Sequence, residues 1–128
     1  MKKIIFLIIF INFSFAKIEG LSELLLFLFP KITDKKIIKI YTLPKYYIYF
    51  KNPKFKLVID CNKSDIVFGN ISCLDKPVFA LSYRFYKKNN HAFGVFYYRK
   101  GRPQLKLKKE ILKKYFKKIP NEIKGHVE

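Results

Sequence analysis

Three short apolar runs in the second half of the chain constrain its fold more than any other feature. They are residues 65–69 (DIVFG), 77–83 (PVFALSY) and 92–98 (AFGVFYY). Each has the length of a strand and lacks regular alternation of apolar and polar residues, which is the pattern of strands buried on both faces of a sheet. Such strands need cover on both sides, so the runs predict an α/β fold.

Helices are predicted at both ends of the folded region. Apolar residues at helical spacing indicate a buried helix over 18–29, which Pro30 should end. A second helix is predicted over 109–119, where apolar residues form one stripe and lysines take the other face. Pro120 should end this helix, and the Lys-Lys pair at 117–118 suits the negative end of its dipole.

Other segments complete the predicted sheet. Residues 34–42 and 55–60 have the composition of strands, while 45–50 (KYYIYF) fits either a strand or a short helix. Residues 87–91 form a polar turn. Residues 104–108 (QLKLK) alternate, which predicts an edge strand with its leucines inward and its lysines outward. We therefore expect a small two-layer or three-layer α/β sandwich with a mixed sheet of about five strands.

The first 16 residues have the composition of a secretory signal peptide. Two lysines precede an apolar stretch over residues 4–15, and Ser14 and Ala16 are the small residues expected before a cleavage site. The apolar stretch is shorter than the roughly 20 residues of a membrane-spanning helix. The alternatives are an uncleaved anchor and a core element. We predict cleavage, export to the periplasm, and a single α/β domain over residues 17–128.

The net charge of +18 is less informative than it looks. Lys, Ile, Phe, Tyr and Asn are abundant, Ala and Gly are scarce, and Trp is absent, which is the bias of an AT-rich genome. Arginine is the better indicator of a binding site, because its planar fork recognises carboxylates and phosphates. The chain has three arginines, Arg84, Arg99 and Arg102, and two of them flank one predicted turn.

That turn, RKGRP at 99–103, is the candidate binding site. Arg99, Lys100 and Arg102 surround Gly101, whose turn can expose backbone N–H groups to an anion. The plain alternative is a solvated turn that leads into an edge strand. Export argues against nucleic acid as the target, whereas an anionic membrane surface or an acidic partner is compatible with it.

Cys61 and Cys73 are candidates for a disulfide, since an exported protein folds in an oxidising compartment. The alternative is a pair of buried thiols. An extended run over residues 65–69 separates the two cysteines, so the chain must fold back to bring them together.

No catalytic or metal-binding pattern stands out, and we expect neither an enzyme nor a cofactor. His91 lies in a polar turn and His126 near the end of the sequence, and neither belongs to a spaced motif. Asp60 and Asp65 lie near strand ends, where α/β sites often occur, but aspartates at such positions are more often turn residues. The spacing of the two cysteines matches no common zinc site.

The order of these segments resembles the YfiR-type periplasmic regulators. A helix ending in FLFP precedes the strand IIKIYT, then come CNKSDIVFGN, KPVFALSY and AFGVFYYRKGRPQLKLKKEI, and the last helix closes with KKIPNEI. The resemblance covers most of residues 18–123. It implies a non-enzymatic α/β domain that binds a membrane-bound signalling protein, typically a diguanylate cyclase. The chain is short for the family, so some connecting helices must be reduced, and Cys61 precedes its strand, so the family's disulfide pattern does not transfer.

A weaker resemblance is to one lobe of a periplasmic solute-binding protein. It implies a small domain for an anionic ligand as the alternative function. A third alternative is a cationic envelope-associated protein that is bound by charge alone.

Overall fold

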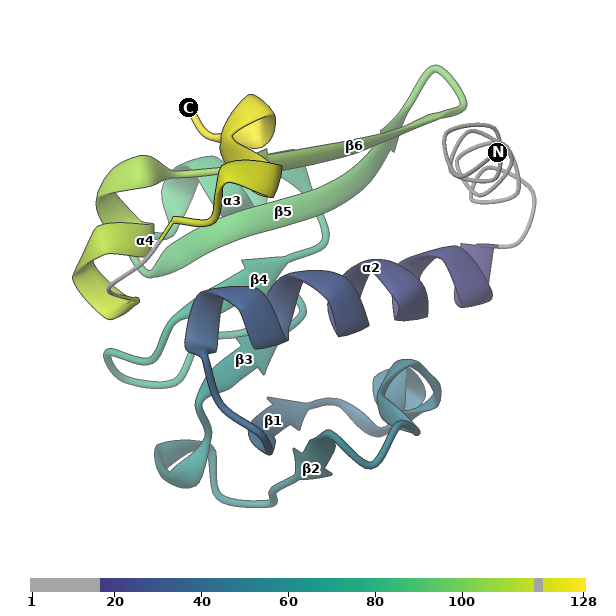
Figure 1. Cartoon of the computed structure of the whole chain (residues 1–128), viewed down its shortest axis with the longest axis vertical. Helices are drawn as coiled ribbons and strands as arrows, with labels where there is room; N and C mark the ends of the chain where they lie inside the picture. Colours follow the sequence, from purple (N-terminus) through teal and green to yellow (C-terminus); the bar gives the residue numbers. More distant parts are fainter. Residues whose placement is uncertain (1–16, 117–118) are drawn as a thin grey trace.

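The computed structural model describes residues 17–116 and 119–128 (Figure 1). The predicted signal peptide over 1–16 and the Lys-Lys pair at 117–118 lie outside the described residues. The described chain has the predicted α/β fold, with a mixed sheet of six strands and helices at both ends. The elements in chain order are α2 (Lys17–Thr33), β1 (Ile38–Thr42), η1 (Pro44–Phe50), β2 (Phe55–Leu57), η2 (Cys61–Lys63), β3 (Ile66–Phe68), β4 (Val78–Ala80), α3 (Tyr83–Lys88), β5 (Ala92–Arg99), β6 (Arg102–Leu107), α4 (Lys109–Tyr115) and η3 (Asn121–His126).

The sheet has the strand order β2-β1-β3-β4-β5-β6. The first five strands in this order are parallel to one another, and β6 runs antiparallel to β5. All five parallel strands therefore end at the same edge, which we call the carboxyl edge. The opposite edge, where they begin, is the amino edge. In open α/β sheets, ligands bind preferentially outside the carboxyl ends of the strands.

The apolar runs form β3, β4 and most of β5, and they are buried on both faces of the sheet as predicted. On one face α2, η1 and α4 cover the strands (Figure 1). The ring of Phe29 lies in this core, with the ring centroids of Phe50, Phe55, Phe79 and Phe93 between 5.4 and 6.5 Å away. On the other face α3 and two loops form a second core, so the sheet is the middle of three layers.

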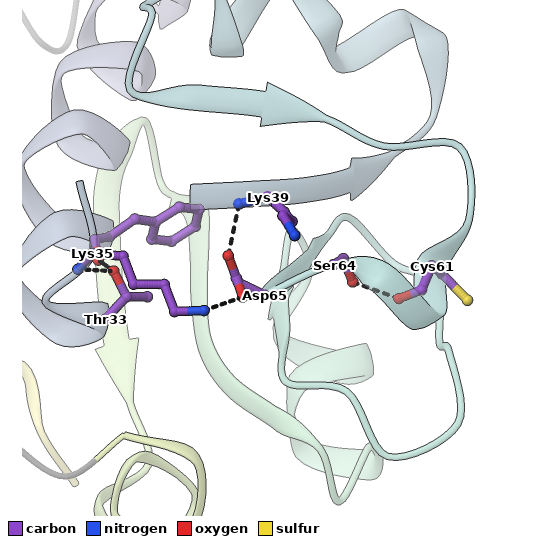
Figure 2. A network of polar contacts seen from close by, with 7 residues as sticks. Thr33, Lys35, Lys39, Cys61, Ser64 and Asp65 are labelled. Atoms are coloured by element: carbon purple, nitrogen blue, oxygen red, sulfur yellow. Dashed lines mark hydrogen bonds and ion pairs between the residues drawn. The ribbon is translucent and has the colours of Figure 1, made fainter. Parts of the chain in front are cut away.

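The predicted disulfide between Cys61 and Cys73 is present, with the two Cα atoms 6.0 Å apart. It joins the β2–β3 connection to the β3–β4 connection on the second face. The chain folds back because η2 makes one tight turn, in which the Asp60 carboxylate accepts from the backbone N–H of Asn62 at 3.0 Å. The Ser64 hydroxyl donates to the Cys61 carbonyl at 2.7 Å and closes this turn (Figure 2).

The prediction that Pro30 ends the first helix was wrong, because α2 continues to Thr33. A proline within a helix loses a hydrogen bond and costs about 3 kcal/mol. One more turn of helix buries Ile32 in the first core, which offsets part of this cost. The backbone N–H of Asp34 donates to the Pro30 carbonyl at 2.9 Å, and the chain then leaves the helix at Asp34 with a φ of 55°.

Helix α3 was not predicted. The predicted strand over 77–83 ends at Ala80, and the predicted turn over 87–91 begins inside this helix. Ser82 caps α3, since its hydroxyl accepts from the backbone N–H of Phe85 at 3.2 Å. No Glu or Gln stands three residues after Ser82, so the usual capping-box signature is missing from the sequence.

The remaining differences concern the ends of elements. β1 begins four residues later than predicted and β2 ends three residues earlier. Residues 45–50 belong to the 3₁₀ helix η1, so the helical alternative is the correct one. α4 ends at Tyr115, because Phe116 takes extended backbone angles and its ring packs 5.2 Å from that of Phe93.

Gly94 marks a bulge in the middle of β5. The pairing between β4 and β5 shifts by one residue, so Phe93 has no residue opposite it on β4 and Gly94 lies opposite Phe79. A Cβ atom on Gly94 would lie 2.7 Å from Cδ2 of Leu107 and 3.1 Å from two ring carbons of Phe79. Only a residue without a side chain fits between these two strands.

We expect Gly94→Ala to lower the free energy of unfolding by about 1–3 kcal/mol, the usual cost of overpacking a core. Gly125→Ala is the matched control, because a Cβ atom there meets nothing within 4 Å, and its effect should stay within about 0.5 kcal/mol. Urea unfolding followed by circular dichroism measures both. Equal stabilities of the two variants would contradict the close packing at Gly94.

We expect the double substitution Cys61→Ala/Cys73→Ala to lower the free energy of unfolding by roughly 3 kcal/mol, because the disulfide restricts the unfolded chain. A thiol reductant should produce a similar loss in the wild-type protein and leave the double variant unchanged. The prediction fails if reductant destabilises both proteins equally.

Candidate binding surface at the carboxyl edge

The predicted turn over 99–103 is the tip of the β5–β6 hairpin, which projects beyond the rest of the sheet (Figure 1). Arg99 and Arg102 are directly paired across the two strands, and all four residues from Arg99 to Arg102 are exposed. Lys100 and Gly101 have φ angles of 52° and 77°, as in the two-residue turns that suit the twist of a hairpin. The turn geometry is thus explained without an anion, and a site here depends on the basic side chains.

The third arginine lies at the same edge of the sheet. Arg84 is exposed in the first turn of α3, four residues after the carboxyl end of β4. Arg99 is the last residue of the neighbouring strand β5, and Arg102 the first of β6. All three arginines of the sequence therefore lie at the carboxyl edge, whereas lysines are found on every part of the described chain.

An aromatic cleft of ≈ 450 Å³ opens beside these arginines. Tyr83 and Tyr97 approach each other to 5.5 Å between ring centroids, and the ammonium groups of Lys87 and Lys106 lie 5.5 and 5.3 Å from the Tyr83 ring centroid. The cleft lining contains no acidic residue and consists of Leu21, Tyr49, Leu81, Ser82, Tyr83, Phe96, Tyr97 and Tyr98. Arg84 and Arg99 each directly follow a lining tyrosine in the sequence. The arrangement suits an apolar or aromatic group that carries negative charge nearby.

The hairpin turn was predicted from the sequence, whereas the cleft and the position of Arg84 were not. The cleft combines residues from α2, η1, β5 and the β4–α3 junction, and nothing in the sequence shows that these segments meet. The one local signal was the group of aromatic residues at the end of β5, Phe96, Tyr97 and Tyr98, whose stacking potential beside the basic turn was considered only for nucleic acid, which export disfavours.

A second pocket, of ≈ 760 Å³, lies at the amino edge. There Asp65 holds the α2–β1 connection against β3 (Figure 2). Its carboxylate accepts from the Lys35 ammonium at 2.6 Å and from the backbone N–H of Lys39 at 2.8 Å. Asp60 caps η2, as described above, so both aspartates that were considered near strand ends have local structural contacts.

Neither histidine lies beside a nucleophile in a catalytic arrangement. Nδ1 of His91 is 2.6 Å from the Tyr115 hydroxyl, and Nδ1 of His126 is 3.2 Å from the Leu105 carbonyl oxygen. Burial raises the pKa of Tyr115 above its ordinary value. Within residues 17–116 and 119–128, no three His, Cys, Asp or Glu side chains are grouped as a metal site requires.

The base of the hairpin is anchored by a polar cluster on the second face. The Lys108 ammonium donates to the backbone carbonyls of Tyr86 and Asn89, and so caps the end of α3. The Tyr86 hydroxyl donates to the Glu128 carboxylate at 2.9 Å. The prediction that Lys106 and Lys108 simply point into solvent was therefore wrong, because α3 covers this side of β6.

Comparisons with protein-family models, with curated proteins and with solved structures found no match to this chain. The likeness to YfiR-type regulators and to a solute-binding lobe therefore stays a prediction. Among the described helices, none combines the length and the apolar character needed to cross a membrane.

The polar cluster predicts a specific response to alkaline pH. Burial, with the hydrogen bond to Glu128 as a second cause, raises the pKa of Tyr86 well above its ordinary value. The folded protein therefore keeps the Tyr86 proton at pH values where the unfolded chain loses it. The stabilisation by protonated Tyr86 is complete below the unfolded pKa of about 10, and the free energy of unfolding falls at higher pH by up to about 1.4 kcal/mol per pH unit. Lys108 acts in the opposite sense, because burial lowers its pKa and stability rises as it loses its proton.

We expect Tyr86→Phe to be about 1 kcal/mol less stable than the wild type at pH 8, because the hydrogen bond to Glu128 is lost. Above pH 10 the difference should shrink, since only the wild type has Tyr86 to ionise. Urea unfolding at pH 8 and pH 11 measures both differences. Lys108 is present in both proteins, so its opposing effect cancels, and a constant difference across this range would contradict the assignment.

Proposed function

We propose that this chain is an exported, non-enzymatic domain that regulates a membrane-bound signalling protein by binding an acidic element of it at the carboxyl edge. The binding surface consists of the hairpin tip, Arg99–Arg102, together with Arg84 and the aromatic cleft. The domain acts in the periplasm, where the composition of residues 1–16 predicts that the chain is sent.

The observation that carries this proposal is that all three arginines lie at the carboxyl edge, two of them directly after tyrosines that line the aromatic cleft. In a chain whose lysine content follows genome bias, the placement of arginine is the less biased signal. Arginine forms two parallel hydrogen bonds with a carboxylate, and aromatic side chains supply the buried contact area that dominates most interfaces.

The position of the surface also supports a protein partner. The hairpin tip extends away from both cores, so its side chains can contact a partner without disturbing the fold. The order of segments that resembles the YfiR-type regulators agrees with this role and is an independent ground for it.

The proposal is tested by crosslinking in intact cells, followed by purification of the domain with its attached proteins. We expect the wild type to recover one integral membrane protein. Arg99→Gln/Arg102→Gln should reduce its yield at least about tenfold, because two charge-assisted contacts are lost, with the melting temperature nearly unchanged. Lys113→Gln/Lys114→Gln is the matched control, since both lysines are exposed on α4.

Equal recovery by the two double variants would remove the hairpin from the proposed surface. The solute-binding alternative has its own signature, because the melting temperature of such a domain would rise with a small anion such as citrate or inorganic phosphate.

A further inference from the structure

One stretch of the chain combines high positive charge with exposed apolar side chains. Residues 35–59 contain seven lysines and neither Asp nor Glu. The stretch includes β1, η1 and β2, which lie together at one end of the sheet (Figure 1). A longer run without acidic residues, over 76–109, contains the three arginines, but none of the large apolar side chains that the described residues leave exposed lies in it.

The same stretch holds most of the large apolar side chains that the described residues leave exposed. Seven such residues are exposed in total, and five of them lie between residues 35 and 59. Four of these are at the carboxyl edge, namely Leu43, Tyr47, Ile48 and Ile59, and we call them the apolar corner. Ile59 is the most exposed, at 95%, and Tyr47 and Ile48 are exposed at 40% and 41%.

Helix η1 presents the apolar corner on a fixed support. The inner side of the helix is held by aromatic contacts, because the rings of Tyr46, Tyr49 and Phe50 lie 5.5, 6.1 and 5.0 Å from the ring of Phe68. Tyr47 and Ile48 lie between these anchors in the sequence and belong to neither core. Neither side chain contributes to a core, so packing within the fold does not explain why both residues are apolar.

Ile59 reaches the same edge from β2. The backbone N–H of Val58 donates to the Ile40 carbonyl at 2.9 Å, which extends the parallel pairing of β1 and β2 by one residue. Ile59 therefore follows beside the end of β1, where Leu43 leads into η1.

Exposed lysines accompany the apolar corner, since Lys45 lies in η1 itself and Lys51 directly follows it. Lys45, Lys51, Lys54 and Lys56 are all exposed. None of them takes part in the three ion pairs formed within the described residues. A surface with an apolar centre and a border of unpaired cations suits an anionic amphiphile.

We propose that the apolar corner and its bordering lysines bind the surface of an anionic phospholipid bilayer. The apolar side chains enter the boundary between headgroups and acyl chains, and the ammonium groups stay at the level of the lipid phosphates. A bilayer suits this region better than a protein does, because none of the corner residues lines either pocket described above. The region offers an apolar projection with a charged border, and no shaped cavity for a partner's side chain.

This inference goes beyond the proposed function and does not depend on it. If both hold, the lipid contact turns the carboxyl edge toward the membrane. The hairpin tip lies at that edge, so Arg99 and Arg102 would then contact a part of the signalling protein close to the bilayer.

The absence of tryptophan from the sequence allows a direct test. Ile48→Trp introduces one fluorophore at the apolar corner, in the protein expressed from the full sequence and purified in the form that the cell produces. Vesicles of phosphatidylglycerol and phosphatidylcholine should shift its emission to shorter wavelength, and lipids brominated on their acyl chains should quench it. Leu74→Trp is the matched control, because Leu74 is equally apolar and 74% exposed but lies outside residues 35–59. Its emission should not change with vesicles.

Sedimentation with the same vesicles measures the strength of binding. Tyr47→Ser/Ile48→Ser should lower the partition coefficient about tenfold, and Leu74→Ser should leave it unchanged. Lys45→Gln/Lys51→Gln should lower it about fivefold for each lysine removed and reduce its dependence on salt. Circular dichroism checks that every variant is folded.

Two results would overturn the proposal. The first is equal vesicle binding by the wild type and Tyr47→Ser/Ile48→Ser, with no spectral shift for Ile48→Trp. The second is a wild type that ignores vesicles while Tyr47→Ser/Ile48→Ser loses a crosslinked membrane protein, which would make the corner a protein contact. A failure of the Arg99 and Arg102 experiment affects neither test, so the two proposals can fail separately.

Discussion

The packing of α2 against the sheet is the contact on which the rest of the fold depends. Its Phe29 ring touches aromatic rings from η1, β2, β4 and β5, so one side chain links segments from most of the chain. Strands that are apolar on both faces cannot stay in water on either side. The helix therefore continues past Pro30, because the sheet beneath it still has to be covered.

The second face is covered with much less helix. Only α3 and the single turn of η2 lie in the connections there, and the disulfide between Cys61 and Cys73 joins the two loops that replace longer helices. Because the helical cover on this face is short, part of the sheet stays exposed there. β1 alternates between buried and exposed residues, and Lys39 and Lys56 are adjacent on its uncovered face. The stretch over 35–59 thus includes a part of the sheet that is open on one face.

The α/β class, the β5–β6 hairpin and the cysteine pair could be predicted from the sequence, because each has a local signature. The apolar runs identify central strands, and the RKGRP turn has Gly101 where a positive φ is needed. What could not be predicted depends on contacts between distant segments. Pro30 looked like a helix end because local propensity favours one there, and only the buried position of Ile32 explains why the helix continues. The aromatic cleft and the position of Arg84 emerge only when the strand order is known.

The outer edges of the sheet are protected to different degrees. Along β6, the backbone of Glu128 bonds to that of Leu107 and Lys109, and Pro103 has no N–H to offer. A second chain would therefore find few unpaired groups on that strand. β2 forms the opposite edge with only three residues, one of them Lys56, which is a common defence against edge-to-edge aggregation. Any protein that extends this sheet by adding a strand must do so beside β2, and it would need a negative charge there to accommodate the lysine.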